Sequence, residues 1–143
     1  MKKSIGVIAE YNPFHNGHLL HLTKARRIAG GALPVIAVMS GSVVQRGEPA
    51  FCNKWARAQM AVQNGADLVL ELPAVFSCRS AEFFAAGAVQ LLAATGITGY
   101  LAFGAETAET QTLADAAHFI NTHQEELRAI IKSGASYATA QST

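Results

Sequence analysis

The chain has 143 residues, of which half are hydrophobic and 15% are charged, and its net charge at pH 7 is +1. This length and composition allow one domain with a substantial hydrophobic core and exclude a disordered or purely solvating segment. The small net charge does not indicate a general nucleic-acid binder, and no apolar run is long enough to cross a membrane.

The charges are unevenly distributed along the chain. Residues 1–79 hold nine Lys/Arg and four Asp/Glu, a balance of +5, whereas residues 80–143 hold two and six, a balance of −4. The first half therefore favours anions such as a nucleotide phosphate, although an accidental asymmetry explains the counts equally well. The two cysteines, Cys52 and Cys78, lack CxxC spacing, which is typical of a reduced, cytoplasmic protein.

The predicted elements alternate between strand and helix along the chain. In chain order they are a strand at 5–9, a helix at 18–29, a strand at 33–39, a loop at 40–51, a helix at 53–64, a strand at 68–72, a helix at 80–95, a strand at 99–103, and helices at 110–121 and 124–132. The run at 33–39 is continuously apolar, as in a parallel strand covered on both faces. This order predicts an α/β fold with a doubly wound parallel sheet.

Polar residues and glycines are concentrated in the loops that follow strands, at 10–17, 40–49, 73–79 and 104–107. The loops at the other strand ends are short and plain. Because the carboxyl ends of parallel strands meet at one edge of the sheet, we expect all four polar loops there. Ligands of open α/β sheets bind at that edge, so this uneven distribution of polar loops predicts that the functional site lies there.

The first of these loops carries the motif His15-Asn16-Gly17-His18 where a strand is followed by a helix. Gly17 allows a ring or a phosphate to approach the backbone closely. His18 is expected in the first turn of the helix, where free N–H groups and the helix dipole favour an anion, and His15 can point to the same place. Two imidazoles and a helix N-terminus would cradle a nucleoside triphosphate and stabilise charge during in-line transfer.

Other roles for these histidines stay open. The three-residue spacing of His15, His18 and His21 is compatible with metal ligands, but Pro13 and Gly17 place His15 off the helix and no carboxylate or cysteine completes a set, so no metal is predicted. Helix capping or packing is the alternative for His18. His21 is expected to be a partly exposed helix residue. The sequence has no GxGxxG, GK[ST], HExxH or GxSxG motif.

The motif and its surroundings resemble the bacterial tRNA(Met) cytidine acetate ligases of the HxGH nucleotidyltransferase superfamily. The resemblance covers nearly the whole chain and is carried by four blocks in order, AEYNPFHNGHLLHL, MSGSVVQRGEPA, RAQMAVQNGADLVLELP and FGAE. It implies a Rossmann-like nucleotide-binding domain over residues 1–143. It also implies an enzyme that uses ATP, with Mg2+, to activate acetate as acetyl-adenylate and then acetylates N4 of the wobble cytidine of elongator tRNA(Met).

The resemblance also implies roles for single residues. His15 and His18 would act on the ATP phosphates as catalytic residues, and Arg46 would be the loop cation that meets phosphate, acetate or RNA. Gly104 would face the base or ribose, with an ordinary strand-end turn as the alternative. The ATP-binding residues that the resemblance implies are Ile8, Ala9, Glu10, Tyr11, Asn12, Pro13, Phe14, His15, Asn16, Gly17, His18, Leu19, Leu20, His21 and Gly104.

Several charged residues near these blocks have two interpretations. A surface ion pair with Glu48 is the alternative role for Arg46. Lys54 and Arg57 either extend a basic surface or belong to a solvated helix face. Glu71, inside an apolar strand, is either a site residue at the strand end or an outward-facing one.

The sequence departs from the family pattern in three ways. Ser42-Val43 replaces an expected Asn-Phe, Ala105 replaces a serine, and the family runs to more than twice this length. We therefore expect an N-terminal part of the family's chain, with tRNA bound mainly through parts that it lacks. Two other functions stay open, namely an adenylyl- or cytidylyltransferase on a small phosphorylated metabolite, and a non-catalytic nucleotide- or RNA-binding module.

Overall fold

The computed structural model of the protein describes residues 3–105, 109–134 and 139. The chain forms two compact units, Met1–Gly104 and Ala105–Thr143. The first unit contains a four-stranded sheet with helices α1 to α4, and the second contains helices α5 and α6. Residue 106, which ends the FGAE block, and residue 107, which ends the last predicted loop, lie outside the described residues.

The sheet of the first unit is parallel throughout, with the strand order β3-β2-β1-β4. Its strands are β1 (Ser4–Ala9), β2 (Val35–Ser40), β3 (Leu68–Leu72) and β4 (Thr98–Ala102). β2 is buried along its whole length, as its continuous apolar sequence predicts. The chain places β2 and β3 on one side of β1 and then returns to place β4 on the other. The strand order therefore reverses between β1 and β4.

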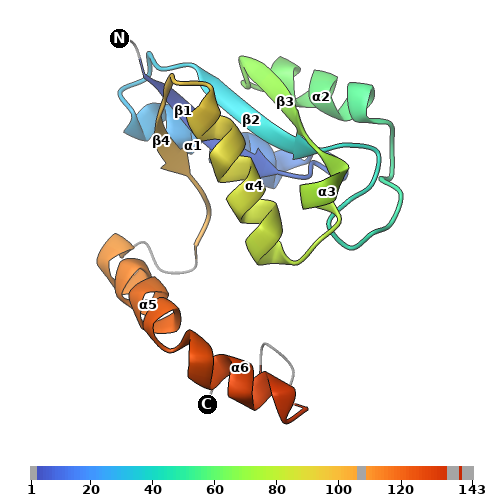
Figure 1. The fold of residues 1–143 in the computed structure, drawn as a ribbon. Coiled ribbons are helices and arrows are strands. Elements are labelled where there is room, and N and C mark those ends of the chain that lie inside the picture. Colours follow the sequence, from blue (N-terminus) through green and yellow to red (C-terminus); the bar gives the residue numbers. More distant parts are fainter. Residues whose placement is uncertain (1–2, 106–108, 135–138, 140–143) are drawn as a thin grey trace. The chain divides into compact units, whose positions relative to one another are not determined.

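Helices cover both faces of this sheet, which confirms the predicted α/β fold (Figure 1). α1 (Asn16–Ile28) and α2 (Lys54–Gln63) lie on one face, and α4 (Ala81–Ala94) lies on the other. The crossover from β1 to β2 runs through α1, that from β2 to β3 through α2, and that from β3 to β4 through α3 and α4. This is the doubly wound arrangement.

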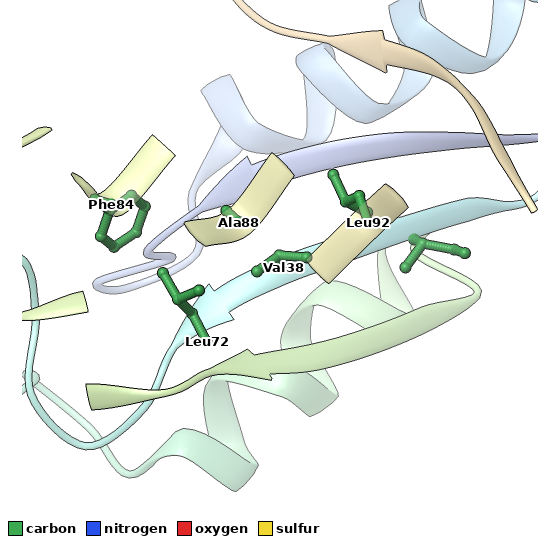
Figure 2. Packing of buried hydrophobic residues seen from close by; sticks show 6 residues of the cluster. Val38, Leu72, Phe84, Ala88 and Leu92 are labelled. Carbon is green, nitrogen blue, oxygen red and sulfur yellow. The ribbon is translucent and has the colours of Figure 1, made fainter. Parts of the chain in front are cut away.

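The alternation of side chains along β2 divides the core between the two faces. Ile36 and Val38 face α4, where Figure 2 shows Val38 and Leu72 packed with three side chains of that helix, Phe84, Ala88 and Leu92. The opposite face holds residues of the same strand packed with α1 and α2, namely Val35, Ala37 and Met39. Each large apolar side chain buried in these layers contributes about 1.5–3 kcal/mol.

Two local differences from the predicted elements have physical causes. α1 begins at Asn16 instead of residue 18, because the preceding His15 caps it with its own side chain. The stretch at 73–79, expected as loop, contains the short helix α3 (Ala74–Ser77). The Pro73 carbonyl accepts the N–H groups of Phe76 and Ser77, and this makes a single helical turn.

The second unit consists of α5 (Thr110–Thr122) and α6 (Gln124–Lys132), which match the predicted helices closely. His123 joins the two helices. In the described part of the chain, no helix is both long and apolar enough to span a membrane.

Candidate functional site

The motif of two histidines lies at the point where the strand order reverses. The loop after β1 leads into α1, and residues 103–104 follow the neighbouring strand β4, whose Ala102 is in register with Val7 of β1. In doubly wound sheets, ligands bind in the crevice outside the carboxyl ends of the strands at such a reversal. The structure thus brings the motif and Gly104 to the same sheet edge, although they are far apart in sequence.

His15 and His18 cap the first turn of α1 reciprocally. The Gly17 N–H donates to His15 Nδ1 at 3.1 Å, and the His15 N–H donates to His18 Nδ1 at 3.2 Å. The two imidazole rings stack with 3.7 Å between their centroids. This is the geometry of a capping box, built from imidazoles instead of a hydroxyl and a carboxylate. Helix capping, the alternative role for His18, is therefore present in the structure.

The capping bonds also fix which ring nitrogen carries the proton. Because Nδ1 of His15 and Nδ1 of His18 both accept hydrogen bonds, each neutral ring holds its proton on Nε2. No residue in the described part of the chain accepts a hydrogen bond from either Nε2. Each imidazole can therefore cap the helix with one nitrogen and donate to a ligand with the other.

The pKa of His18 lies below its ordinary value of 6.5. Burial is the largest cause, followed by repulsion from His15 and His21. At neutral pH His18 is therefore uncharged, which its role as a hydrogen-bond acceptor in the cap requires.

The rings of Tyr11 and Phe14 contact the imidazole ring of His18. Tyr11 is 1% exposed, and its ring meets His18 edge-on with 4.9 Å between centroids, while Phe14 lies 5.4 Å from the same imidazole. Tyr11 has a φ of 49°, a left-handed conformation that is unusual for a bulky residue. Its burial raises the pKa of the phenol to about 12. Among the described side chains, Tyr11 Oη and His21 Nε2 are buried polar atoms without a partner.

The His15 ring leaves no room for a side chain at residue 17. A Cβ at this position would lie 2.9 Å from Cε1 and 3.0 Å from Nδ1 of His15, which is closer than carbon and nitrogen atoms pack. A side chain at residue 17 would therefore require the His15 ring to shift. Gly104 has a different environment, because a Cβ there would meet no described atom within 4 Å.

Arg57 of α2 holds the loops of the site together from inside the protein. It is fully buried and donates to the carbonyl oxygens of Glu10 at 2.6 Å, Ser40 at 3.1 Å and Cys52 at 3.2 Å, and also to that of Gly41. Both predicted roles for Arg57, a basic surface and a solvated helix face, are therefore wrong. Burial lowers the pKa of the Arg57 guanidinium below its ordinary value, and neighbouring Cys52, Glu10 and Glu71 oppose that shift.

Two further bonds join the loop after β1 to the loop after β2. Glu10 Oε1 accepts the N–H of Gln45 at 2.6 Å, and Asn12 Oδ1 accepts the N–H of Phe51 at 2.6 Å. The polar residues of the first loop thus fix the position of the second. This role of Glu10 and Asn12 was not predicted, and it involves side chains that the family resemblance assigns to ATP.

The charged residues of the second loop and of α2 are now placed. Arg46 is exposed in a tight turn in which the Val44 N–H donates to the Glu48 carbonyl at 2.9 Å. The ion pairs found in the described part of the chain do not include Arg46 with Glu48. Lys54 Nζ instead pairs with Glu71 Oε2 at 2.6 Å, so Glu71 faces outward at the strand end.

The remaining residues of the predicted ATP-binding segment lie in several environments. Ile8 and Ala9 are half-buried at the end of β1, whereas Pro13, Asn16, Leu19 and Leu20 are exposed. No group of three or more His, Cys, Asp or Glu residues in the described part of the chain is placed to hold a metal ion.

Known proteins are similar to this chain in sequence and in fold. The tRNA(Met) cytidine acetate ligase of Acetivibrio thermocellus is 47% identical, with 97% of this chain and 34% of that protein aligned. The protein of the same name from Halalkalibacterium halodurans is 50% identical, over 98% of this chain and 34% of its own length. A crystal structure of Thermotoga maritima TmcAL bound with alpha-thio ATP is 45% identical, with a TM-score of 0.87 over 97% of this chain and 34% of that one.

The chain thus spans about a third of the length of these relatives. The sequence model of the HIGH Nucleotidyl Transferase family matches it from residue 1 to residue 143. The chain belongs to the HIGH nucleotidyl transferase family.

Proposed function

We propose that the protein acts as an ATP-dependent acetate ligase on elongator tRNA(Met), and that this chain supplies its nucleotide-binding part. One observation carries the proposal. Nδ1 of His15 and of His18 are both engaged in the helix cap, so two Nε2–H donors remain at the N-terminus of α1. The names of the relatives and the ATP analogue bound to the Thermotoga maritima protein support the choice of substrates.

The triphosphate would bind at the N-terminus of α1, where unpaired N–H groups and the helix dipole favour anions. The two imidazoles would add directed N–H donors, and Arg46 would add a positive charge from the second loop. Mg2+ would arrive with the phosphates, because it commonly binds through substrate oxygens and water. The described residues offer no group of three metal-binding side chains that would hold it otherwise.

Two chemical steps would follow from this placement. In the first, a carboxylate oxygen of acetate attacks the α-phosphorus of ATP, a P–O bond forms, and pyrophosphate leaves. The N–H donors of His15, His18 and the helix stabilise the charge that builds on the phosphate oxygens, and one such donor is worth about 3 kcal/mol of barrier. In the second, N4 of the cytidine attacks the acetyl carbon, loses a proton, and displaces AMP.

The nucleotide site can be tested on this chain by calorimetry with ATP and Mg2+. His18→Gln keeps an N3 side chain that can close the capping box but lacks the imidazole Nε2–H, so we expect folding to persist and the affinity for ATP to fall roughly ten-fold or more. Thr23→Ala, in a later turn of α1, is the matched control. Unchanged ATP binding by His18→Gln would refute the role of the imidazole.

The ligase chemistry is tested with a chimera in which residues 1–143 replace the matching third of the Acetivibrio thermocellus relative. We expect ATP–pyrophosphate exchange that depends on acetate, with the parent relative as the positive control. Exchange that depends on a phosphorylated metabolite instead of acetate would indicate the alternative adenylyl- or cytidylyltransferase. A tRNA substrate would place the protein in the cytoplasm, where the free thiols of Cys52 and Cys78 stay reduced.

A further inference from the structure

Large aromatic rings are exposed next to the loops of the candidate site. The ring-bearing residues Phe51 and Trp55 are 82% and 76% exposed at the start of α2, and Phe83 is 44% exposed at the start of α4. α2 follows the loop after β2, and α4 follows α3 and the loop after β3. Aromatic residues are enriched at binding surfaces, so these exposed rings are candidates for such a surface.

Two of these rings have a cation beside them. Lys54 Nζ lies 5.5 Å from the centre of the Trp55 ring, and the Arg79 guanidinium lies 3.9 Å from that of Phe83. Lys54 also pairs with Glu71, which holds the ammonium near the indole. An aromatic face with a neighbouring cation is the combination that binds single-stranded nucleic acids, with bases on the rings and phosphates on the cations.

The same residues are bonded to the loops of the candidate site. The Phe51 N–H donates to Asn12 Oδ1 at 2.6 Å, which ties this ring's backbone to the loop after β1. The side-chain amide of Gln45 donates to the Arg79 carbonyl at 2.7 Å, and the backbone N–H of Gln45 donates to Glu10. The backbone of Phe51 and the loop before α2 are therefore anchored to the loop that leads into the motif.

We propose that Phe51 and Trp55 bind unpaired bases of the RNA substrate by stacking, an inference that rests on the proposed function. The surface, here called the ring–cation edge, consists of Phe51, Lys54 and Trp55 at the start of α2. RNA fits this surface, because its bases can stack on the rings while its phosphates pair with the Lys54 ammonium. Stacking at this edge would present a neighbouring base to the nucleotide bound at α1.

Trp55 is the single tryptophan among the 143 residues, so its fluorescence reports directly on this edge. We expect the anticodon hairpin RNA of elongator tRNA(Met) to quench that fluorescence in a saturable way. A fully paired RNA duplex offers phosphates but no accessible base faces, and heparin offers only charge, so both should quench weakly. Equal quenching by heparin would overturn the stacking proposal, because it would show a general anion surface.

Two substitutions of Trp55 distinguish an effect of its aromatic ring from an effect on folding. Trp55→Ala should weaken hairpin binding about ten-fold, measured by fluorescence anisotropy of labelled RNA, and Trp55→Tyr should retain most of the affinity. Val62→Ala removes an exposed apolar side chain from the same helix and should change nothing. If Trp55→Ala binds the hairpin as tightly as the unaltered chain does, the proposal is wrong.

Calorimetry with ATP distinguishes this proposal from the proposed function. Trp55→Ala should bind ATP as the unaltered chain does, because its ring lies outside the capped turn. If the unaltered chain binds ATP but the hairpin causes no quenching, the ring–cation edge is not an RNA surface. If the unaltered chain binds no ATP, the proposed nucleotide site fails instead, whatever the fluorescence shows.

Discussion

Arg57 Nη1 donates to the backbone carbonyl of Glu10 at 2.6 Å, which joins two residues 47 positions apart. The same guanidinium donates to the carbonyl oxygens of Ser40 and Cys52. One buried side chain thus satisfies backbone acceptors from the ends of β1 and β2 and from the entry to α2. The planar guanidinium with five donors suits this task, which a lysine ammonium cannot match.

We predict that Arg57→Ala lowers the free energy of unfolding by about 3 kcal/mol or more, because it leaves several buried carbonyl groups without donors. Arg57→Lys should recover only part of that loss. Urea unfolding followed by circular dichroism measures both. Gln59→Ala, at an exposed position of the same helix, should change stability by less than about 0.5 kcal/mol. A loss for Arg57→Ala no larger than this control would show that the carbonyl groups are satisfied in another way.

The sequence carries enough signal for the sheet and most helices. The strand at 68–72 was predicted at its observed bounds, and Asn53, the first residue of the helix predicted at 53–64, caps α2 through its side chain. Strong apolar runs and standard caps act locally, so they can be recognised without the fold. The reversal of strand order beside β1 is a property of the whole topology, which no single segment carries.

The features that were missed depend on tertiary context. Arg57 and Ala61 lie four residues apart on one face of α2, and that face is buried. Ala61 was the one sign in the sequence that this face is buried. Arginine is mostly exposed in proteins, so Arg57 was expected at the surface. α1 starts early because an imidazole caps it, and histidine is not among the preferred N-cap residues. α3 has four residues, too few to show a helical period.

The free energy of unfolding should fall as the pH falls below 6.5. Burial, then His15 and His21, lowers the pKa of His18 in the folded state, and burial lowers that of His21. Between 6.5 and these lowered values, the unfolded chain binds more protons than the folded one, so acid favours unfolding. Above that window the contribution is fully present. Protonation of His18 at Nδ1 also removes the acceptor for the His15 N–H.

Urea unfolding at about pH 7.5 and about pH 5.5 measures this dependence. His18→Gln should reduce the difference between the two values, because glutamine at N3 closes a capping box without titrating. The same dependence in His18→Gln and in the unaltered chain would assign it to other groups. NMR of the imidazole nitrogens should also find the proton of His18 on Nε2 at neutral pH.

His15 can be separated into its two roles by choice of substituent. His15→Asn places a strong N-cap residue before α1, so we expect the stability to be kept, whereas His15→Ala should lose about 1 kcal/mol. Both variants lack the Nε2–H, so both should bind ATP more weakly, by roughly ten-fold. Urea unfolding and calorimetry on the same samples give the two readouts. Full ATP affinity in His15→Asn would show that this histidine serves only the helix.

Gly104 allows a similar separation, because a substitution there should leave the fold intact and alter the ligand site. A Cβ at Gly104 meets no described atom within 4 Å, so Gly104→Ala should leave the free energy of unfolding within about 0.5 kcal/mol. If a base or ribose packs against this backbone, the added methyl group should weaken ATP binding several-fold. Gly96→Ala is the matched control, because Gly96 has a φ of +68°. That variant should lose about 1 kcal/mol of stability and keep its affinity for ATP. Undiminished ATP binding by Gly104→Ala would place the nucleotide away from the end of β4.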